Sequence, residues 1–460
     1  MGKKILIVGG GAAGMMCAAL LGDDTTMRVT LVDHNEKLGK KLFITGKGRC
    51  NFTNACEAEE FLNHVLTNPK FLYSALYTLD SDRVIGLFES WGMKTKVERG
   101  RRAFPASDHS SDVIDALRRQ LVKNHVDIRL HTDCRVLLQD ESTGRVIGAV
   151  LFPAENGSLP ARGEVVHENA ALQKGPSVFQ LHRENAEDRA AVEAAFPGGE
   201  IFEADAVVVA TGGISYPSTG STGDGYRFAR DLGLRVTKLY PSLVPVTCEE
   251  DYIREMQGLS LKNVELHVKN GKKEIFDEFG EMMFTHFGVT GPLILSLSAK
   301  IGPLIGKKPL RTWIDLKPAV TEEEFSERLV GIFEKNPNKA LKNVLGEVYP
   351  ARMVEVLPEV AGIDVDTKCH DITKGQRLML VQVTKRFPMT MTALRGYNEA
   401  VVTKGGVAVG AIDPGTMAVK KVPGLYMIGE VLDVDAYTGG YNLQIAWSTA
   451  AVAAAVLKDL

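Results

Sequence analysis

The chain has 460 residues, of which 45% are apolar and 24% are charged, and its formal net charge is −3. This length predicts two or three domains, and the balanced charge gives no reason to expect nucleic acid or an anionic membrane as a partner. No apolar run approaches the roughly 20 residues that span a bilayer.

The chain opens on a short apolar run that ends in glycines. Residues 5–14, ILIVGGGAAG, place Gly9, Gly11 and Gly14 at the spacing G-x-G-x-x-G. This pattern predicts a strand, a tight turn and a helix N-terminus, which together suit the pyrophosphate of a dinucleotide. A second run ends in Asp33, whose carboxylate is placed to accept hydrogen bonds from a ribose, although an acid at a strand end is often only a solvated turn residue. The motif is compatible with FAD or NAD.

Strands and helices alternate in the prediction as far as about residue 151. Residues 153–200 are interrupted by Gly and Pro, and we interpret them as an excursion from the sheet, either a β-hairpin arm or a mobile loop. An apolar run then returns to the sheet. The strands expected in this part are 5–8, 29–32, 128–131, 146–152 and 206–210, and the expected helix is 110–123.

The second half of the chain predicts two further kinds of structure before the sheet is completed. Short runs separated by Gly, Asn and Lys favour a β-rich domain, and a helical stretch follows from TEEEFSERL, a capped start. Because the ending, with a strand at 425–428 and an Ala-rich helix at 443–457, resembles the opening, we expect a discontinuous nucleotide domain. The predicted domains are 1–245 with 400–460 for the nucleotide, 246–320 with 380–399 as a β-rich substrate domain with strand-like pieces at 382–392, and 321–379 as a helical subdomain.

A second glycine-rich segment, GKKLFITGKGRCNFTN at 39–54, combines glycines with basic and amide side chains. Glycines free backbone N–H groups to face a ligand, and Lys and Arg side chains oppose phosphate or electron-rich oxygens. Asn51 and Asn54 offer the paired donors and acceptors that the edge of a flat heterocycle requires. A basic surface turn is the alternative.

Two more segments share this composition. ATGGISYPSTGSTGDG at 210–225 follows an apolar strand, so the chain can pass close beneath a cofactor, although a plain glycine loop is the alternative. GEVLDVDAYTGGYNLQIAWSTA at 429–450 offers Asp433 and Asp435 to ribityl or ribose hydroxyls, unless they are solvated loop residues. It then opens the final helix, whose N-terminus would stabilise negative charge on a reduced flavin.

These segments, together with FTHFGVTGP at 284–292, resemble the bacterial flavoprotein family that includes aminoacetone oxidase and the bile-acid-inducible flavoprotein reductase. The resemblance runs from residue 5 to about 450. It implies an α/β fold in which a discontinuous, glutathione-reductase-type FAD-binding Rossmann domain is interrupted by a β-barrel-like domain and a small helical domain.

The resemblance also implies which residues border FAD. Three departures from the family pattern are Asp33 in place of a common Glu, Thr45 and Thr290 in place of serines, and the segment 153–200. The residues implied to border FAD are Gly9, Gly11, Ala13, Gly14, Asp33, Lys41, Thr45, Gly46, Arg49, Asn51, Val136, Thr211, Gly212, Asp433, Asn442 and Leu443.

Few catalytic groups are required of the protein, because a flavin itself passes hydride through N5. Reduction of an enone still needs a proton donor. Tyr441, Tyr216 and His286 stand in or beside glycine-rich motifs and are the candidates, with a packing or orienting role as the alternative for each. Cys50 has no nearby partner at C-x-x-C spacing and is interpreted as a small residue next to the flavin. We expect no metal site, because no His, Cys and carboxylate set has ligand spacing.

The sequence therefore predicts an FAD-dependent oxidoreductase acting on a small molecule. The resemblance favours NADH- or NADPH-driven reduction of a C=C bond conjugated to a ketone, as in a 3-oxo bile acid or steroid, because the inserted domain is large and apolar. No second G-x-G-x-x-G follows a strand, so the nicotinamide would bind transiently. The alternatives are an oxygen-dependent oxidase of a small amine such as aminoacetone, and a non-enzymatic redox-sensing flavoprotein.

A flavin-dependent RNA-modifying protein is disfavoured by the balanced charge and the lack of a basic, aromatic-rich stretch. The N-terminus passes directly from Met1-Gly2-Lys3-Lys4 into the first strand, so no signal peptide is expected. Since the six cysteines lack C-x-x-C spacing, we expect reduced thiols and a cytoplasmic protein.

Overall fold

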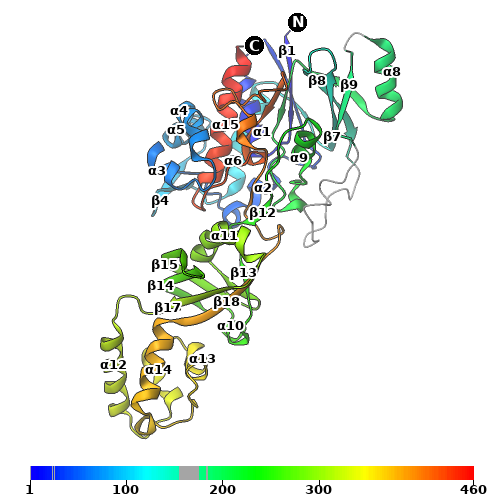
Figure 1. Cartoon of the computed structure of the whole chain (residues 1–460). Coiled ribbons are helices and arrows are strands. Elements are labelled where there is room, and N and C mark those ends of the chain that lie inside the picture. Colours follow the sequence, from blue (N-terminus) through cyan, green and yellow to red (C-terminus); the bar gives the residue numbers. More distant parts are fainter. Residues whose placement is uncertain (1, 23, 25, 155–175, 183–184, 460) are drawn as a thin grey trace. The chain divides into compact units, whose positions relative to one another are not determined.

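The computed structural model describes residues 2–22, 24, 26–154, 176–182 and 185–459. These residues form two compact units (Figure 1). Unit 1 comprises Met1–Pro241 and Tyr397–Leu460, and unit 2 comprises Ser242–Gly396. The chain therefore leaves unit 1 and returns to it, which is the discontinuous arrangement that the sequence predicts. Among the described residues, no helix is both long and apolar enough to cross a membrane.

The centre of unit 1 is a five-stranded parallel sheet in the order β20-β11-β1-β2-β6. Apart from the partly exposed edge strand β6, its strands are largely apolar runs, as expected of parallel strands that are buried on both faces. β20 comes from the C-terminal segment and pairs with β11, so both ends of the chain complete one sheet. The strands are β1 (Lys3–Val8), β2 (Met27–Val32), β6 (Asp127–Arg129), β11 (Ala206–Val209) and β20 (Leu425–Met427).

Helices α1 (Ala12–Leu21), α6 (Ser110–Lys123) and α15 (Tyr441–Lys458) lie together on one side of this sheet (Figure 1). α1 and α15 contact each other, and both bury several alanines, whose small side chains allow helices to approach closely. α15 begins two residues before the predicted start. The other helices of unit 1 are α2 (Lys40–Ile44), α3 (Ala58–Asn63), α4 (Tyr73–Thr78), α5 (Ser81–Ser90), α8 (Ala186–Ala195), α9 (Asp224–Asp231) and the 3-10 helices η1 (Thr45–Gly48), η2 (Pro69–Leu72), η3 (Pro217–Thr219), η7 (Val409–Ala411) and η8 (Gly429–Val431).

Unit 1 also carries three smaller sheets. One has four strands in the order β10-β8-β7-β9 and a small core of its own. The described part of the predicted excursion thus forms a strand, a helix and a strand joined to this sheet, not a β-hairpin arm, and residues 155–175 lie outside the described residues. The strands are β7 (Thr132–Asp140), β8 (Val146–Pro153), β9 (Val178–Leu181) and β10 (Glu200–Glu203), then β3 (Thr53–Asn54), β4 (Thr95–Glu98) and β5 (Arg102–Pro105), and the pair β12 (Tyr240–Ser242) and β19 (Val402–Lys404).

Unit 2 is built on a closed six-stranded barrel in the order β13-β16-β15-β14-β17-β18. The alternation of buried and exposed residues along β14 fits this arrangement. Val264, Leu266 and Val268 are buried, while the residues between them are at least partly exposed. The apolar helix α11 packs on β15 and β18. The elements are β13 (Val246–Cys248), β14 (Ser260–Asn270), β15 (Lys273–Thr285), β16 (Gly288–Thr290), β17 (Leu310–Asp315), β18 (Phe387–Leu394), α10 (Asp251–Glu255) and α11 (Pro292–Ile305).

A helical part completes unit 2 and shares one hydrophobic cluster with the barrel. The capped helix start is confirmed, since Thr321 and Glu324 form a reciprocal capping box. The prediction of strand-like structure from residue 382 is wrong for 382–385, which form the last turn of α14, because Val383 and Thr384 are buried on a face of this helix. The helices are α12 (Glu322–Lys335), α13 (Met353–Val360), α14 (Lys374–Lys385) and the 3-10 helices η4 (Leu341–Asn343), η5 (Leu345–Glu347) and η6 (Cys369–Asp371).

Candidate functional site

The glycine turn between β1 and α1 has the geometry of a phosphate cradle. Gly9 has a φ of +107°, and a Cβ added there would lie 2.5 Å from the carbonyl oxygen of Ala210. A Cβ on Gly14 would lie 1.9 Å from the carbonyl oxygen of Gly9, so both glycines allow close packing. Gly11 differs, because a Cβ there has no described atom within 4 Å. The open side of the turn at Gly11, next to the uncapped N-terminus of α1, is therefore free for an anionic group.

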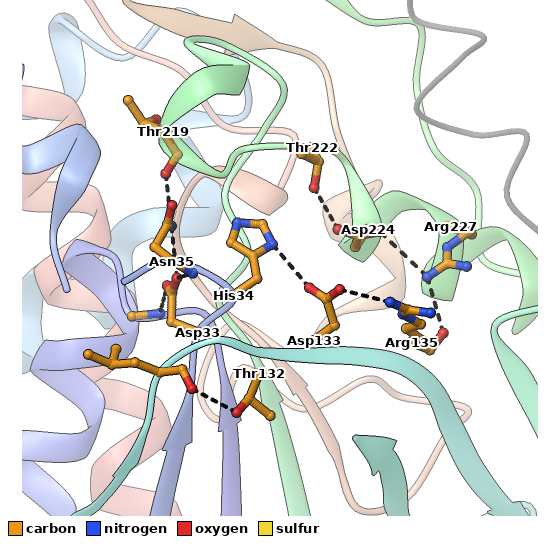
Figure 2. A network of polar contacts seen from close by, with 12 residues as sticks. Asp33, His34, Asn35, Thr132, Asp133, Arg135, Thr219, Thr222, Asp224 and Arg227 are labelled. Atoms are coloured by element: carbon orange, nitrogen blue, oxygen red, sulfur yellow. Dashed lines mark hydrogen bonds and ion pairs between the residues drawn. The ribbon is translucent and has the colours of Figure 1, made fainter. Parts of the chain in front are cut away.

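Asp33 ties this turn to the next loop (Figure 2). Its Oδ2 accepts a hydrogen bond from the backbone N–H of Gly10 at 2.6 Å, and its Oδ1 accepts two from Asn35, each at 2.8 Å. The Asn35 side chain in turn donates to the Thr219 carbonyl at 3.1 Å. The carboxylate that we expected at a ribose thus has a structural role that the pattern did not indicate, and its ribose contact stays a prediction.

His34 continues the network toward β7 (Figure 2). Its Nδ1 lies 3.4 Å from Oδ1 of Asp133, and both side chains are less than one-fifth exposed. Burial lowers the pKa of His34, but the hydrogen bond with Asp133 and the charges of Asp33, Asp133 and Asp224 outweigh it, so the net shift is upward. The imidazole therefore links the loop after β2 to the start of β7, and the contact favours its protonated form.

We expect this link to make the stability of the apoprotein depend on pH. Because the pKa of His34 is raised on folding, its contribution is complete below the unfolded value near 6.5 and is lost as the pH rises through the folded value. His34→Gln is expected to lose about 1 kcal/mol of unfolding free energy at pH 6 and less at pH 8.5. Urea unfolding at both pH values measures this, with His109→Gln, at an exposed histidine, as the control. An equal loss at both pH values would contradict the charged pair.

Lys41 and Glu430 form a second network that joins three glycine-rich segments. The Lys41 Nζ donates to Oε2 of Glu430 at 2.7 Å and to Oγ of Ser215 at 2.5 Å. The Glu430 Oε1 accepts from Ser215 Oγ at 3.0 Å and from the Thr403 N–H at 2.9 Å. Sequence reasoning missed Glu430, Ser215 and Thr403. The available signal was an acid directly after Gly429, opposite in charge to the lysines of segment 39–54.

Two buried polar atoms of segments 39–54 and 210–225 have no hydrogen-bond partner within the described part of the chain. They are the Oδ1 of Asn51 and the Oγ1 of Thr211. Buried oxygens of this kind usually find a hydrogen-bond partner, so a bound group with donors is the simplest account. Residues Gly46, Lys47 and Gly48 all have positive φ, which turns the backbone of this segment as expected for a ligand loop. These features fit FAD.

The final helix offers a further anchor. Gly440 has a φ of +95°, and a Cβ there would lie 2.4 Å from the backbone of Thr53, so only glycine fits before α15. No side chain caps this N-terminus, and its first N–H groups can meet an electron-rich ring. Asn442 closes the preceding loop, because its amide bonds both the N–H and the carbonyl of Ala436.

The other residues that the resemblance implies to border FAD also lie in unit 1. Arg49 pairs with Glu98 and Asp108, each at 2.5 Å, and stacks on the Phe104 ring. Val136 is 2% exposed in the small core of the four-stranded sheet, so only its backbone can meet a ligand. Thr45 donates to the carbonyl of Lys41 at 3.0 Å. Ala13 is buried and Leu443 half-buried on their helices, Gly212 has a φ of +70°, and Asp433 precedes α15.

The three candidate catalytic residues lie in different local surroundings. Tyr441 is buried between Phe61 and His64, and burial raises the pKa of its hydroxyl, which favours a packing role. Tyr216 lies in unit 1 with a φ of +50°, and His286 is exposed at the turn between β15 and β16 in unit 2. Burial also raises the pKa of the Cys50 thiol, which suits the small, unreactive residue that we expected.

Comparison with known proteins now identifies the family. A model of the HI0933-like protein Rossmann domain matches residues 3–150 and 163–456. The chain belongs to the HI0933-like family. The resemblance and the fold class that the motifs predicted are thereby confirmed. As a member of this flavoprotein family the chain is an FAD-dependent oxidoreductase, in agreement with the cradle geometry above.

Three relatives match nearly the whole chain. A ribosomal RNA dihydrouridine synthase of Escherichia coli is 31% identical over 97% of this chain and 95% of its own length. A protein of the same name from Haemophilus influenzae is 30% identical, over 97% and 96%. A 3-dehydro-bile acid delta(4,6)-reductase of Clostridium scindens is 27% identical, over 97% of each.

Among solved structures, the 3-ketosteroid delta1-dehydrogenase of Sterolibacterium denitrificans superposes with a TM-score of 0.51 at 14% identity, covering 99% of this chain and 100% of the other. This likeness shows a shared fold.

Proposed function

We propose that the protein reduces a C=C bond conjugated to a carbonyl group, and that its substrate is a uridine of ribosomal RNA. The observation that carries this is the chemistry common to differently named relatives. Dihydrouridine arises by saturation of the uracil C5=C6 bond, which is conjugated to the C4 carbonyl. A delta(4,6)-reductase of a 3-oxo compound likewise saturates bonds conjugated to a ketone.

Different residues of unit 1 would hold different parts of FAD. The turn at Gly11 with the N-terminus of α1 would receive the pyrophosphate, and segment 39–54 with Thr211 would bond the flavin edge. The N-terminus of α15 would stabilise negative charge on the pyrimidine side. When bound, FAD supplies hydride that it has received from NADH or NADPH. The protein must then orient the acceptor, exclude water and deliver one proton.

A 3-oxo bile acid or steroid is the second candidate substrate, favoured by the Clostridium scindens relative. It undergoes the same reaction, so only the acceptor differs. RNA as the first candidate departs from the expectation drawn from the balanced charge. Two relatives at 30% and 31% identity support it, against one at 27%.

Complementation tests the RNA substrate. An E. coli strain that lacks its own ribosomal RNA dihydrouridine synthase is expected to regain dihydrouridine in ribosomal RNA when it expresses this chain. Mass spectrometry of nucleosides from purified ribosomal RNA measures the product, with the Gly11→Val variant as a flavin-free control. Absence of dihydrouridine, with the protein expressed and yellow, would reject this substrate.

Anaerobic spectroscopy separates the reaction classes. The flavin band is expected to bleach with NADH or NADPH and to return on addition of unmodified ribosomal RNA or of a 3-oxo-4-ene steroid. Bleaching by aminoacetone, followed by peroxide formation in air, would instead support the oxidase. Bleaching that no organic acceptor reverses would favour the redox sensor.

A further inference from the structure

Six basic side chains gather at one end of the barrel in unit 2. They come from two short stretches of the chain, KNGKKE at 269–274 and GKKPLR at 306–311, which together contain six basic residues and one acidic residue. The whole chain has a formal net charge of −3, so positive charge is concentrated here in an otherwise acidic chain. We call this group the cationic end; its members are Lys269, Lys272, Lys273, Lys307, Lys308 and Arg311.

The strand register brings the two stretches together. β14 and β17 are antiparallel neighbours in which Val268 pairs with Thr312, so the chain beyond Val268 runs beside the chain that enters β17. β15 returns from the same tip, and residues 306–309 connect α11, which packs on β15, to β17. The Lys269 Nζ lies 5.0 Å from the centroid of the Trp313 ring, which is a direct contact between the two strands.

The charge of the cationic end faces solvent. All six of its residues are exposed, and within the described ranges none of their side chains forms an ion pair. The single acid, Glu274, is opposite Lys269 in the register of β14 and β15. Basic residues elsewhere differ, since Lys96 in unit 1 lies 2.6 Å from a carboxylate oxygen of Asp108. The cationic end is therefore suited to an anionic partner outside the chain.

Aromatic rings lie beside these charges on the outer face of the barrel. Trp313 is partly exposed and stacks on His267, with ring centroids 5.2 Å apart and planes at 11°. Phe279 on β15 is 60% exposed and pairs with Glu265 of β14. The carboxylates of Glu265 and Asp277 both lie at His267, at 3.6 and 3.2 Å, and so away from the tip. Cations that follow a phosphate backbone, next to aromatic rings, are typical of surfaces that bind single-stranded nucleic acid.

We propose that the cationic end binds the RNA substrate, through contacts of its Lys and Arg side chains with phosphates that flank the reacting uridine. This inference rests on the proposed function with RNA as the substrate. RNA presents a row of phosphates, and each one that a Lys or Arg neutralises releases counterions and adds affinity. A 3-oxo bile acid carries at most one carboxylate, so six cations exceed what it can use. Unit 2 would supply affinity for RNA, while unit 1 holds the flavin.

The same assembly explains why the sequence shows no basic, aromatic-rich stretch. The two basic stretches are separated by more than thirty positions, and the aromatic residues stand on three different strands. They become one surface only through the pairing of β14 with β15 and β17. The balanced net charge therefore does not describe the charge that a partner of this end would meet.

Filter binding of unmodified ribosomal RNA, purified from the E. coli strain that lacks its own dihydrouridine synthase, tests this surface. Each of two double variants is expected to bind RNA about 10-fold more weakly than a control that loses the same charge. The slope of log Kd against log salt concentration should fall by about 1.5, because each lost phosphate contact contributes about 0.7–0.9. The variants are Lys272→Gln with Lys273→Gln and Lys307→Gln with Lys308→Gln, and the control, in exposed lysines of the helical part, is Lys335→Gln with Lys339→Gln.

The half-reaction of the reduced holoenzyme gives an independent measurement. The double variants should need about 10-fold more RNA for half-maximal reoxidation, with the maximal rate of the control, because the cationic end binds RNA and does not touch the reacting atoms. Flavin absorbance per protein and the unfolding midpoint are expected to stay at wild-type values, since the substituted side chains are exposed. These two measurements separate weaker RNA binding from damage to the fold.

The outcomes separate this surface from the proposed reaction. Double variants that bind RNA as tightly as the control, while RNA still reoxidises wild type, would overturn the cationic end and leave the reaction standing. Weaker binding by the double variants, in a protein that RNA does not reoxidise, would support the surface and overturn uridine as the substrate. A wild-type protein that binds phosphatidylserine vesicles but no ribosomal RNA would overturn both.

Discussion

A Gly11→Val variant is expected to purify folded but colourless. Gly11 has a φ of −81°, which any residue adopts, and an added Cβ meets no described atom within 4 Å. The branched side chain would instead occupy the place of the pyrophosphate at the N-terminus of α1. Losing two phosphate hydrogen bonds, at about 1.5–3 kcal/mol each, corresponds to a loss of FAD affinity of about 100-fold or more. Flavin absorbance per protein and a calorimetric titration of the apoprotein with FAD measure this.

Gly14→Ala is the matched comparison, because its added methyl group would enter the packing of the protein itself and not the place of the ligand. Its Cβ would lie 1.9 Å from the Gly9 carbonyl oxygen, inside the packing of strand and helix. This variant is therefore expected to lose folding stability, whereas Gly11→Val keeps the unfolding midpoint of the wild-type apoprotein. A Gly11→Val protein with a full complement of flavin would show that the turn is not the pyrophosphate site.

The sequence predicts the parallel sheet well, because three of its strands, β1, β11 and β20, are apolar runs that lead into glycine turns. The strands at 5–8, 29–32 and 206–209 lie side by side as parallel neighbours. The prediction fails where the same pattern of residues is compatible with both a strand and a helix. The apolar residues before Phe387 look like part of a strand, yet they complete α14, since their neighbours across the helix belong to the core of unit 2.

The candidate site, too, can be predicted only in part from the sequence. The glycine turns of the site can be predicted from the sequence, because a positive φ and a close backbone approach are properties of single residues. Hydrogen-bond partners that are distant in the sequence leave no comparable pattern. Lys41 and Glu430 are 389 positions apart, and Asp33 bonds the glycine turn itself. The sequence singles out Asp433 as a residue for FAD hydroxyls, but not its contacts, because the Val407 carbonyl and the Asn68 side chain that bond its backbone are distant in the chain.

The second large effect is expected at the Lys41–Glu430 pair. The two side chains are about one-quarter and one-fifth exposed, at 24% and 22%, and the carboxylate accepts from three donors. Glu430→Gln keeps the shape and an oxygen for Ser215 and Thr403, but its amide N–H₂ then faces the Lys41 ammonium. Because a donor opposes a partly buried cation, we expect a loss of about 2 kcal/mol of unfolding free energy in the apoprotein.

A double-mutant cycle shows whether this loss belongs to the pair. Lys41→Met removes the ammonium, so Glu430→Gln in that background should cost only about 0.5 kcal/mol, leaving a coupling energy of about 1.5 kcal/mol. Urea unfolding of the four apoproteins measures it. Additive losses would mean that Glu430 acts only through Ser215 and Thr403. A large coupling would establish that one carboxylate holds segment 39–54 against segments 210–225 and 429–450 before any cofactor binds, so that the apoprotein already carries the shape of its flavin site.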